Sequence, residues 1–317
     1  MILALRALGV GDLATAVPAL RALRAAHPGR DLVLAAPGWL APLVALVGGV
    51  DRLVPTDGLG RPDPALGTPR VAVNLHGRGP ESHRMLAGTR PGRLLAYASP
   101  EAGHHDGPEW RDDEHEVDRW CRLLDWYGIP ADRIDLDLRR PAPGGVPTGV
   151  TVLHPGSKIP AKRWPPGRFA ALARDLAARG HRVVLTGSPD ERATAQRIAD
   201  AAGLPADAVL AGRTDLGRLA ALVAYARLVV SGDTGVAHLA TGYRTPSVVL
   251  FGPVSPARWG PPPGRPRHRV LWAGGQGRPG WEGVGSHPTL AAIGVDEVVA
   301  AVDEVERAVR VSRAVAA

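Results

Sequence analysis

The 317-residue chain has a single cysteine, Cys121, and therefore cannot form a disulfide within itself. A chain without disulfides fits a reducing compartment, so we expect a cytoplasmic protein. Long hydrophobic runs are also missing. Arg6 and Asp12 interrupt the apolar stretch at the N-terminus, whereas a signal peptide needs an unbroken hydrophobic region. No stretch approaches the ~18 apolar residues that cross a bilayer, so we expect any membrane association to be peripheral.

Aromatic residues make up only 4% of the chain, although its formal net charge is +7. Such a charge is compatible with nucleic acid, an anionic membrane surface or a phosphorylated small molecule as partner. The basic residues are scattered, however, and few aromatic side chains are available to stack on bases. We therefore expect no nucleic-acid partner, and peripheral contact with an anionic membrane surface stays open.

Lysine is nearly absent from the chain. Of the 38 basic residues only Lys158 and Lys162 are lysines, and both lie in one short segment. The bias toward Arg, Ala, Gly and Pro is typical of a GC-rich genome, yet this segment keeps its ammonium groups. An ammonium and a planar guanidinium bind ligands differently. The two retained lysines therefore indicate that this segment contains a ligand site that needs an ammonium group.

The length exceeds a usual single domain of roughly 100–200 residues, which favours two domains. Short β-branched runs alternate with Ala- and Leu-rich segments of helical spacing, as in βαβ units with parallel sheets. We predict strands at 2–8, 31–36, 51–54, 71–75, 93–97, 150–154, 181–186, 207–211, 227–231, 246–251 and 268–272. We predict helices at 12–26, 38–47, 80–88, 113–127, 167–179, 189–202, 214–225, 235–242 and 295–311.

Proline and glycine concentrate at 139–149, which is the best candidate for a linker. The sequence thus predicts an α/β protein with two Rossmann-like domains, 1–145 and 146–317. The polar segment 99–113 is predicted to be an irregular surface loop.

The first chemical motif is Gly9-Val10-Gly11-Asp12, between a predicted strand and a predicted helix. Open α/β sheets bind ligands at the carboxyl ends of their strands, where Asp12 would lie. Asp12 is therefore either a functional carboxylate or an N-cap that accepts a backbone hydrogen bond. The third glycine of the dinucleotide fingerprint is missing, so the motif does not support NAD binding.

The second motif, HPGSKIPAKRW at 154–164, follows a predicted strand. Ser157 offers a hydroxyl, and Lys158 and Lys162 offer positive charge to phosphate oxygens. The spacing differs from that of a Walker P-loop. A solvated basic loop is the alternative interpretation.

The third motif, SGDTGVAH at 231–238, contains Asp233 and opens a predicted helix. The Thr234 hydroxyl and the first helical amides would face an anion, and Gly235 leaves room for its approach. His238 shares the helix face of Thr234, although a purely structural histidine is an equal alternative.

A further strand-to-helix turn, TGSPDE at 186–191, carries Asp190 and Glu191. This acidic pair would either bond ribose hydroxyls or complement the helix N-terminus. Three such turns at one sheet edge would converge on one ligand, for which a nucleoside diphosphate is the natural candidate.

Two ligand-rich stretches do not predict a metal site. Asp135-Leu136-Asp137 matches a D-x-D pattern, but its period-two alternation is explained by extended structure. The His, Asp and Glu residues of 104–116 lack the ordered spacing of zinc ligands. We expect no metal and no cofactor, and no Gly-x-Ser-x-Gly elbow supports a nucleophilic hydrolase.

Taken together, these stretches resemble glycosyltransferase family 9, the heptosyltransferase family. The opening Arg6-to-Asp12 segment, HPGSKIPAKRWP, SGDTGVAHLA and TPSVVLFGPVSPARWGP carry the resemblance, which is weakest over 55–112. It implies a GT-B fold, with two Rossmann-like domains facing across a cleft and a C-terminal helix that packs back toward the first domain. It also implies an inverting, metal-independent transfer from a donor such as ADP-heptose.

The resemblance also implies roles for single residues. Asp12 matches the general base of the family, with Gly9 and Gly11 in the acceptor-side loop. Lys162 matches the phosphate-binding lysine, and the pyrophosphate loop matches Asp233, Thr234, Gly235 and His238. The ribose-binding acid of the family has no clean match, because either Pro189 or Glu191 falls at its place.

We therefore expect a glycosyltransferase that moves a sugar from a nucleotide-diphosphate donor to a hydroxyl of a glycan, glycolipid or small molecule. The first domain would bind the acceptor and the second the donor. Two alternatives remain, a GT-B-fold nucleotide-sugar epimerase or hydrolase and a non-catalytic nucleotide-sugar or nucleic-acid binding protein.

Overall fold

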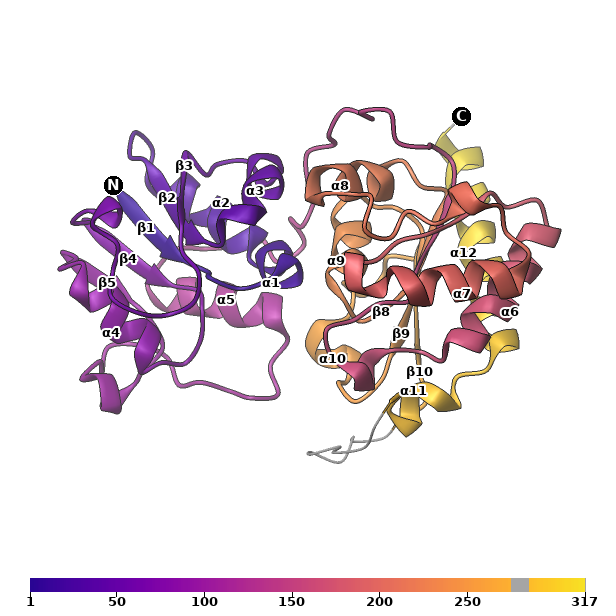
Figure 1. Cartoon of the computed structure of the whole chain (residues 1–317). Coiled ribbons are helices and arrows are strands. Elements are labelled where there is room, and N and C mark those ends of the chain that lie inside the picture. The colour runs from indigo at the N-terminus through magenta and orange to yellow at the C-terminus, as the bar shows by residue number, and fades with distance from the viewer. Residues whose placement is uncertain (275–284, 317) are drawn as a thin grey trace. The chain divides into compact units, whose positions relative to one another are not determined.

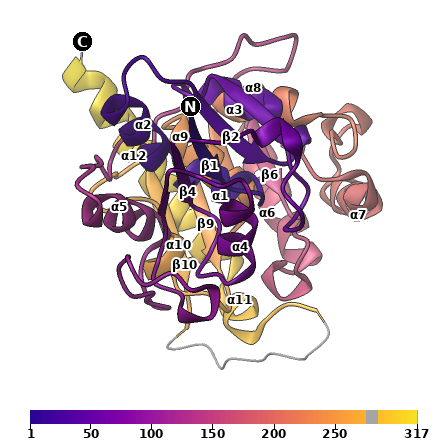
Figure 2. The ribbon, with the colours of Figure 1, turned by 90° about the vertical axis from the view of Figure 1, so that its left-hand side faces the viewer.

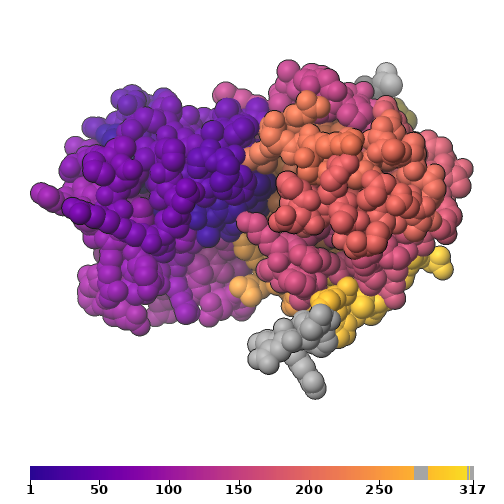
Figure 3. All heavy atoms as spheres, viewed as in Figure 1, coloured from indigo at the N-terminus to yellow at the C-terminus, as the bar shows by residue number. Residues whose placement is uncertain are grey.

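The computed structural model describes residues 1–274 and 285–316. The chain folds as two units, Met1–Arg139 and Arg140–Ala317, each compact by itself (Figures 1 and 3). The boundary lies at the start of the Pro- and Gly-rich segment, a few residues before the expected position at 145. This segment is tied to unit 2, because Arg140 donates to the Tyr243 carbonyl at 2.9 Å.

Unit 1 is built on five parallel strands in the order β3-β2-β1-β4-β5. Figure 2 shows β2, β1 and β4 side by side. The strand order reverses direction between β1 and β4, which is where open α/β sheets bind their ligands. The strands are β1 (Ile2–Leu5), β2 (Leu32–Ala36), β3 (Arg52–Pro55), β4 (Val71–Asn74) and β5 (Arg93–Leu95).

The single helix predicted at 12–26 is wrong, because the structure has two helices there. These are α1 (Val10–Thr15) and α2 (Val17–Ala26), joined at Ala16. Pro18 explains the break, since proline has no amide hydrogen to donate to the carbonyl four residues earlier. It lies instead in the first turn of α2, where that donor would have no partner within the helix.

The remaining elements of unit 1 are three helices and three short 3₁₀ turns. These are η1 (Gly38–Leu40), α3 (Ala41–Val47), η2 (Pro64–Leu66), α4 (Glu81–Gly88), η3 (Pro100–Ala102) and α5 (Glu116–Trp126). The predicted surface loop 99–113 is anchored near its end by Trp110. The Trp110 ring lies edge-on to Tyr97, 5.1 Å between centroids, and the Arg119 guanidinium lies 3.9 Å from the centroid of its indole.

Cys121 lies on the inner face of α5 and is fully buried between Val117 and Leu136. Burial raises the pKa of its thiol to about 12. The thiol is therefore protonated at neutral pH, and only the thiolate is a good nucleophile.

Unit 2 has the second parallel sheet, in the order β10-β9-β8-β6-β7. Its order reverses direction between β6 and β8, so the turns after these two strands share the ligand-binding position. The strands are β6 (Thr151–His154), β7 (Val183–Leu185), β8 (Leu228–Gly232), β9 (Ser247–Phe251) and β10 (His268–Trp272).

The strand predicted at 207–211 is also wrong. The chain forms the 3₁₀ turn η6 (Ala206–Ala208) and makes only an isolated bridge between Leu185 and Val209. The run is too short to pair further, because Pro205 precedes the turn and Gly212, at φ 71°, bends the chain away after it.

Helices and 3₁₀ turns surround this sheet (Figure 1). They are η4 (Pro160–Lys162), α6 (Pro166–Ala178), η5 (Pro189–Glu191), α7 (Arg192–Ala202), α8 (Leu216–Ala224), α9 (Gly235–Gly242), α10 (Pro256–Trp259), α11 (Pro288–Ala292) and α12 (Val295–Ala316). The C-terminal helix α12 packs on α6, β9 and β10 of its own unit. Its expected packing toward the first domain stays a prediction.

Apolar side chains from α12 and the sheet form the core of unit 2. Val298, Val302 and Val305 are buried against the cluster that contains Trp164 and Phe169. Full burial of such a side chain stabilises the fold by about 1.5–3 kcal/mol, which explains how a helix of low intrinsic apolarity is held in place. None of the helices within 1–274 and 285–316 is both long and apolar enough to cross a membrane.

His268 makes the stability of unit 2 depend on pH. Its Nδ1 lies 2.8 Å from the Ser247 hydroxyl, and burial, with Arg265 and Arg267 nearby, lowers the pKa of its imidazole from 6.5 to about 4. The folded state therefore resists protonation between pH 6.5 and 4, whereas the unfolded chain takes up the proton. Stability is retained above pH 6.5 and lost as the pH falls through this window.

We predict that His268→Asn loses less stability than the wild type when the pH is lowered from 7.5 to 4.5. The difference should be about 2–3 kcal/mol, because one pKa unit corresponds to about 1.4 kcal/mol. Urea denaturation at both pH values measures it, with the exposed His105→Asn as control. Equal losses in the wild type and His268→Asn would contradict the prediction.

Candidate functional site

The turn between β1 and α1 holds Asp12 at the switch point of unit 1. Gly9 is the N-cap of α1, and its amide donates to Asp12 Oδ2 at 3.0 Å. Asp12 is thus the third residue of the helix, and its carboxylate accepts from the amide of the N-cap residue, which corrects the interpretation of Asp12 as an N-cap. Its side chain keeps 28% exposure, so the carboxylate is both fixed by the backbone and open to solvent.

Arg6 lies beneath this turn and is completely buried. Its Nε donates to the Asp12 carbonyl at 3.0 Å, and its Nη1 donates to the Leu75 carbonyl. Its Nη2 lies 3.4 Å from Asp12 Oδ1 and 2.8 Å from Glu116 Oε1. A buried charge is tolerated only with such partners, so Arg6 fixes the turn after β1 to the turn after β4.

Glu116, the first residue of α5, is a residue that the sequence motifs missed. It is 9% exposed and accepts hydrogen bonds from Arg119 Nε at 3.2 Å and Trp120 Nε1 at 2.9 Å. Burial alone would raise the pKa of its carboxyl, but Arg6, Arg119 and Trp120 outweigh burial and hold the pKa below its usual value.

His76 is a second residue that the sequence motifs missed. It follows β4, the neighbour of β1, and its amide donates to Asn74 Oδ1 at 3.0 Å. Burial, together with Arg6, lowers the pKa of its imidazole against the opposing influence of Asp12. Its Nδ1 is buried and has no hydrogen-bond partner in the part of the chain that the structure describes. A neutral histidine thus borders the Asp12 turn.

In unit 2 the turns after β6 and β8 meet through an ion pair. Lys162 Nζ lies 2.6 Å from Asp233 Oδ2, and the two side chains are 19% and 6% exposed. The backbones also approach closely, because a Cβ at Gly232 would lie 2.9 Å from the Lys162 carbonyl oxygen. Glycine at 232 therefore permits the contact that brings the two motifs together.

Buried hydroxyls lie beside this ion pair. Thr234 is the N-cap of α9, yet its side chain makes no capping hydrogen bond. The Oγ atoms of Ser231 and Thr234 are buried without a hydrogen-bond partner among the described residues. With Gly235 opening the helix, free amides and hydroxyl groups are present where a helix N-terminus favours an anion.

His238 lies one turn further along α9. Its Nε2 is 3.9 Å from Asp233 Oδ1, and its ring meets Trp259 edge-on at 5.7 Å between centroids. The structure therefore gives His238 packing contacts as well as proximity to the loop, and both interpretations of this residue remain compatible with its position.

Ser157 lies in the same turn as Lys162, after β6, and Glu191 lies in the turn after β7. The Ser157 hydroxyl accepts from the Ile159 amide at 3.2 Å and thus shapes its own loop. Glu191 Oε2 accepts from the Ser188 amide at 2.8 Å. Its carboxylate lies so close to Gly156 that a Cβ there would be 2.2 Å away. Glu191 therefore complements a helix start and also contacts the Lys162 loop.

Arg21 binds the Asp135–Asp137 segment. Its Nη1 forms an ion pair with the Asp135 carboxylate, and its Nη2 donates to the backbone carbonyl of Asp137. Within residues 1–274 and 285–316 no group of three His, Cys, Asp or Glu side chains is arranged to hold a metal ion.

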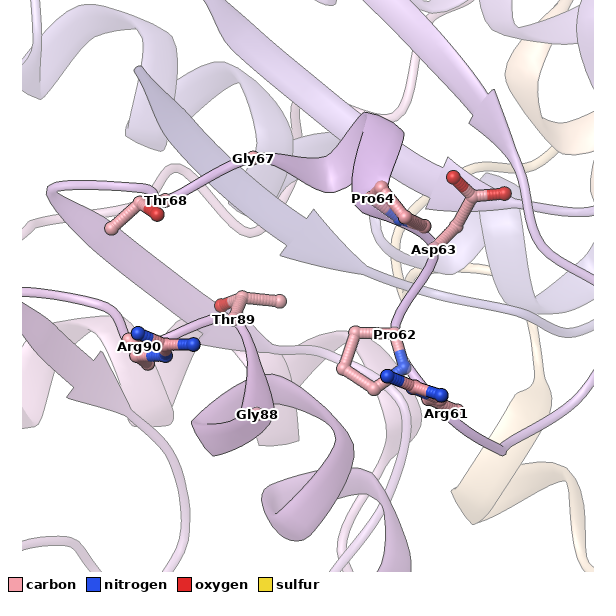
Figure 4. Close-up of a pocket in the computed structure, with 9 residues that line it drawn as sticks. All are labelled: Arg61, Pro62, Asp63, Pro64, Gly67, Thr68, Gly88, Thr89 and Arg90. Carbon is pink, nitrogen blue, oxygen red and sulfur yellow. The ribbon is translucent and has the colours of Figure 1, made fainter.

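A separate hollow of about 800 Å³ lies in unit 1 between Arg61 and Arg90 (Figure 4). Thr68 and Thr89 of its lining precede β4 and β5, so the hollow lies at the amino ends of these parallel strands. Asp12 follows β1 and lies at the opposite edge of the sheet. The hollow is therefore not part of the Asp12 site.

Both units are open parallel α/β sheets with charged side chains at the switch point. In this class of fold, ligand sites lie at the carboxyl ends of the strands. The chain belongs to glycosyltransferase family 9 (heptosyltransferase), because the sequence profile of that family matches residues 107–279, more than half of the chain.

Similar proteins carry heptosyltransferase names. Lipopolysaccharide heptosyltransferase 3 of Escherichia coli is 34% identical over 119 residues, which cover 37% of this chain and 35% of that protein. Lipopolysaccharide heptosyltransferase 2 of E. coli K12 is 38% identical over 106 residues, 32% of this chain and 30% of that one. The matches thus span about a third of the length of these relatives.

The fold extends further than the sequence similarity. The structure of E. coli ADP-heptose LPS heptosyltransferase II superposes with a TM-score of 0.77, covering 96% of this chain and 98% of the other at 22% identity. The predicted α/β fold of the GT-B type is therefore confirmed.

Proposed function

We propose that the protein is a glycosyltransferase that moves heptose from ADP-heptose, or a related nucleotide-diphosphate sugar, to a hydroxyl acceptor. Family membership and the names of the similar heptosyltransferases support this proposal. The observation that carries it is the Lys162–Asp233 pair beside the unpartnered Thr234 hydroxyl at the start of α9. These groups suit a diphosphate, which binds ammonium groups, hydroxyls and helix N-termini.

In this mechanism unit 2 holds the donor. Lys162, the amides at 233–235 and the Thr234 hydroxyl stabilise the negative charge that grows on the departing diphosphate, a role that a divalent cation plays in other enzymes. His238 and Ser157 border the phosphates, and Glu191 is assigned to the nucleoside. No resident metal or cofactor is part of the proposal.

Unit 1 supplies the general base and binds the acceptor. Asp12 accepts the proton of the acceptor hydroxyl while that oxygen attacks the anomeric carbon, and the bond to the diphosphate breaks. The amide of Gly9 and the guanidinium of Arg6 orient the carboxylate. A single displacement of this kind inverts the anomeric configuration.

We also propose a class of acceptor and a cellular location for the enzyme. The named relatives are lipopolysaccharide heptosyltransferases by their titles, so a glycolipid acceptor is assigned first, with glycans and small molecules as the other hydroxyl acceptors. We place the enzyme in the cytoplasm, where the net charge of +7 permits peripheral contact with an anionic membrane.

A donor screen tests the proposed activity directly. ADP-, GDP-, UDP- and dTDP-sugars are incubated with candidate acceptors, and products are identified by mass spectrometry. We expect a glycosylated acceptor with ADP-heptose. Consumption of the donor without any acceptor would instead indicate an epimerase or hydrolase, and no turnover with any donor would contradict the proposal.

Asp12→Ala should reduce kcat by about 10²–10⁴, the usual contribution of a general base, and leave ADP affinity unchanged. Steady-state transfer assays and calorimetry measure the two quantities, with the exposed Asp57→Ala as the control. Near-normal transfer by Asp12→Ala would remove Asp12 from the mechanism.

Lys162→Ala should weaken ADP binding by about 1.5–3 kcal/mol, the value of hydrogen bonds to charged groups. Asp233 would also lose its cation and repel the diphosphate. Lys158→Ala is the matched control, because it removes the same charge from an exposed position of the same loop. Equal losses in both variants, measured by calorimetry, would show that only the net charge of the loop matters.

A further inference from the structure

We propose that Glu116 is a positioning residue for the transfer reaction, because it neutralises Arg6 and thereby leaves the Asp12 carboxylate free to act as a base. The inference rests on the proposed function, in which Asp12 takes the proton of the acceptor. It adds a residue that none of the sequence motifs contains and that lies on α5, more than 100 residues from Asp12 in the sequence.

Arg6 lies between the two carboxylates but bonds them unequally. Its Nη2 lies 2.8 Å from Glu116 Oε1 and 3.4 Å from Asp12 Oδ1. The guanidinium cannot turn away from either, because it donates to the carbonyls of Asp12 and Leu75 and lies 4.6 Å from the ring centroid of Trp120. The shorter and stronger contact belongs to Glu116, which is buried, and the longer one to Asp12, which is partly exposed.

Glu116 also pairs with a second guanidinium. Arg119 Nε donates to Glu116 Oε2 at 3.2 Å, and the remaining Arg119 nitrogens donate to the carbonyls of Arg111 and Glu114. Trp120 Nε1 fills the last position on Oε1 at 2.9 Å. Two arginines and two carboxylates thus form a cluster of zero net charge, which becomes +1 if the charge of Glu116 is removed.

Other groups around Asp12 do not replace this charge. His76 faces the turn from the end of β4, and burial with Arg6 lowers the pKa of its imidazole, so it is neutral at physiological pH. On its own helix Asp12 has Thr15, whose hydroxyl donates to the Asp12 carbonyl at 3.0 Å. Helix α3, which also packs on α1, has no ionisable side chain. Arg21 of α2 is bound to Asp135.

The consequence concerns base strength. Charges act strongly on one another in a buried cluster, because little water screens them. Without the charge of Glu116, the attraction of Arg6 falls on Asp12 alone. The guanidinium then holds the Asp12 carboxylate more tightly, and the carboxylate accepts a proton from the acceptor hydroxyl less readily, so catalysis slows although the carboxylate is still present.

The experiment compares pH profiles of kcat for the wild type, Glu116→Gln and the matched control Glu114→Gln. Glu114 is a similarly buried carboxylate on the same segment, but it is bonded to Arg122 at 2.6 Å instead of Arg6. We expect Glu116→Gln to move the acidic limb of the profile down by about one pH unit and to lower the plateau about tenfold, with KM for the donor unchanged. Glu114→Gln should keep the limb of the wild type.

A purely structural role of Glu116 would reduce the active fraction without moving the limb. An unmoved limb in Glu116→Gln, or an equal shift in Glu114→Gln, would therefore overturn the inference. If Glu116→Gln does not fold, Glu116→Asp is tested in its place. The shorter aspartate side chain keeps the negative charge but moves it away from Arg6 by one methylene. Its limb should shift in the same direction by a smaller amount, and an unmoved limb would again overturn the inference.

Asp12→Ala in the same assay separates this inference from the proposed function. If Asp12→Ala transfers sugar at the wild-type rate, both fail, because Asp12 is then not the base. If Asp12→Ala is inactive and the limb of Glu116→Gln does not move, the role of Glu116 fails and the proposed function stands.

Discussion

All strands within each sheet run parallel, and this constraint decides where the candidate residues lie. Parallel strands deliver their following turns to one edge, and at the switch point two neighbouring turns lie next to each other. In unit 1 the pairing of β1 with β4 brings the Asp12 turn beside His76. In unit 2 the pairing of β6 with β8 brings Lys162 to Asp233.

The buried cations of the two units, Arg6 and Lys162, have different sets of hydrogen-bond partners. Arg6 bonds two carboxylates and two carbonyls in different directions, which requires the planar fork of a guanidinium. Lys162 has one carboxylate partner and keeps part of its surface exposed. A compact ammonium in such a position can turn toward a second anion without leaving the first. In a chain with 36 arginines, the retention of lysine at 162 agrees with this difference.

Much of the fold could be predicted from the sequence, because βαβ alternation and helical spacing are local patterns. The failures are also local in origin. Pro18 breaks the predicted helix, and Pro205 with Gly212 shortens the predicted strand. In both places the apolar pattern continues across the proline, so hydrophobic periodicity alone does not reveal the break.

The candidate residues of unit 2 were predictable because they follow strands in compact motifs. Glu116 was not, because an acidic residue at a helix start after a polar loop is usually solvated. Its burial depends on Arg6, which is 110 positions away in the sequence. The spacing of Glu116 and Trp120, four residues apart on one helix face, was the only local signal that a buried indole would need an acceptor there.

The burial of Cys121 has a practical consequence for spectroscopy. The chain has no other thiol, and this one is enclosed by Val117 and Leu136 with a pKa of about 12. Maleimide and nitroxide reagents react with thiolates that they can reach, so we expect the native chain to remain unlabelled. Two cysteines introduced on exposed positions, one in each unit, would carry the only labels, and dipolar measurements would give the distance between the two labelled positions in solution.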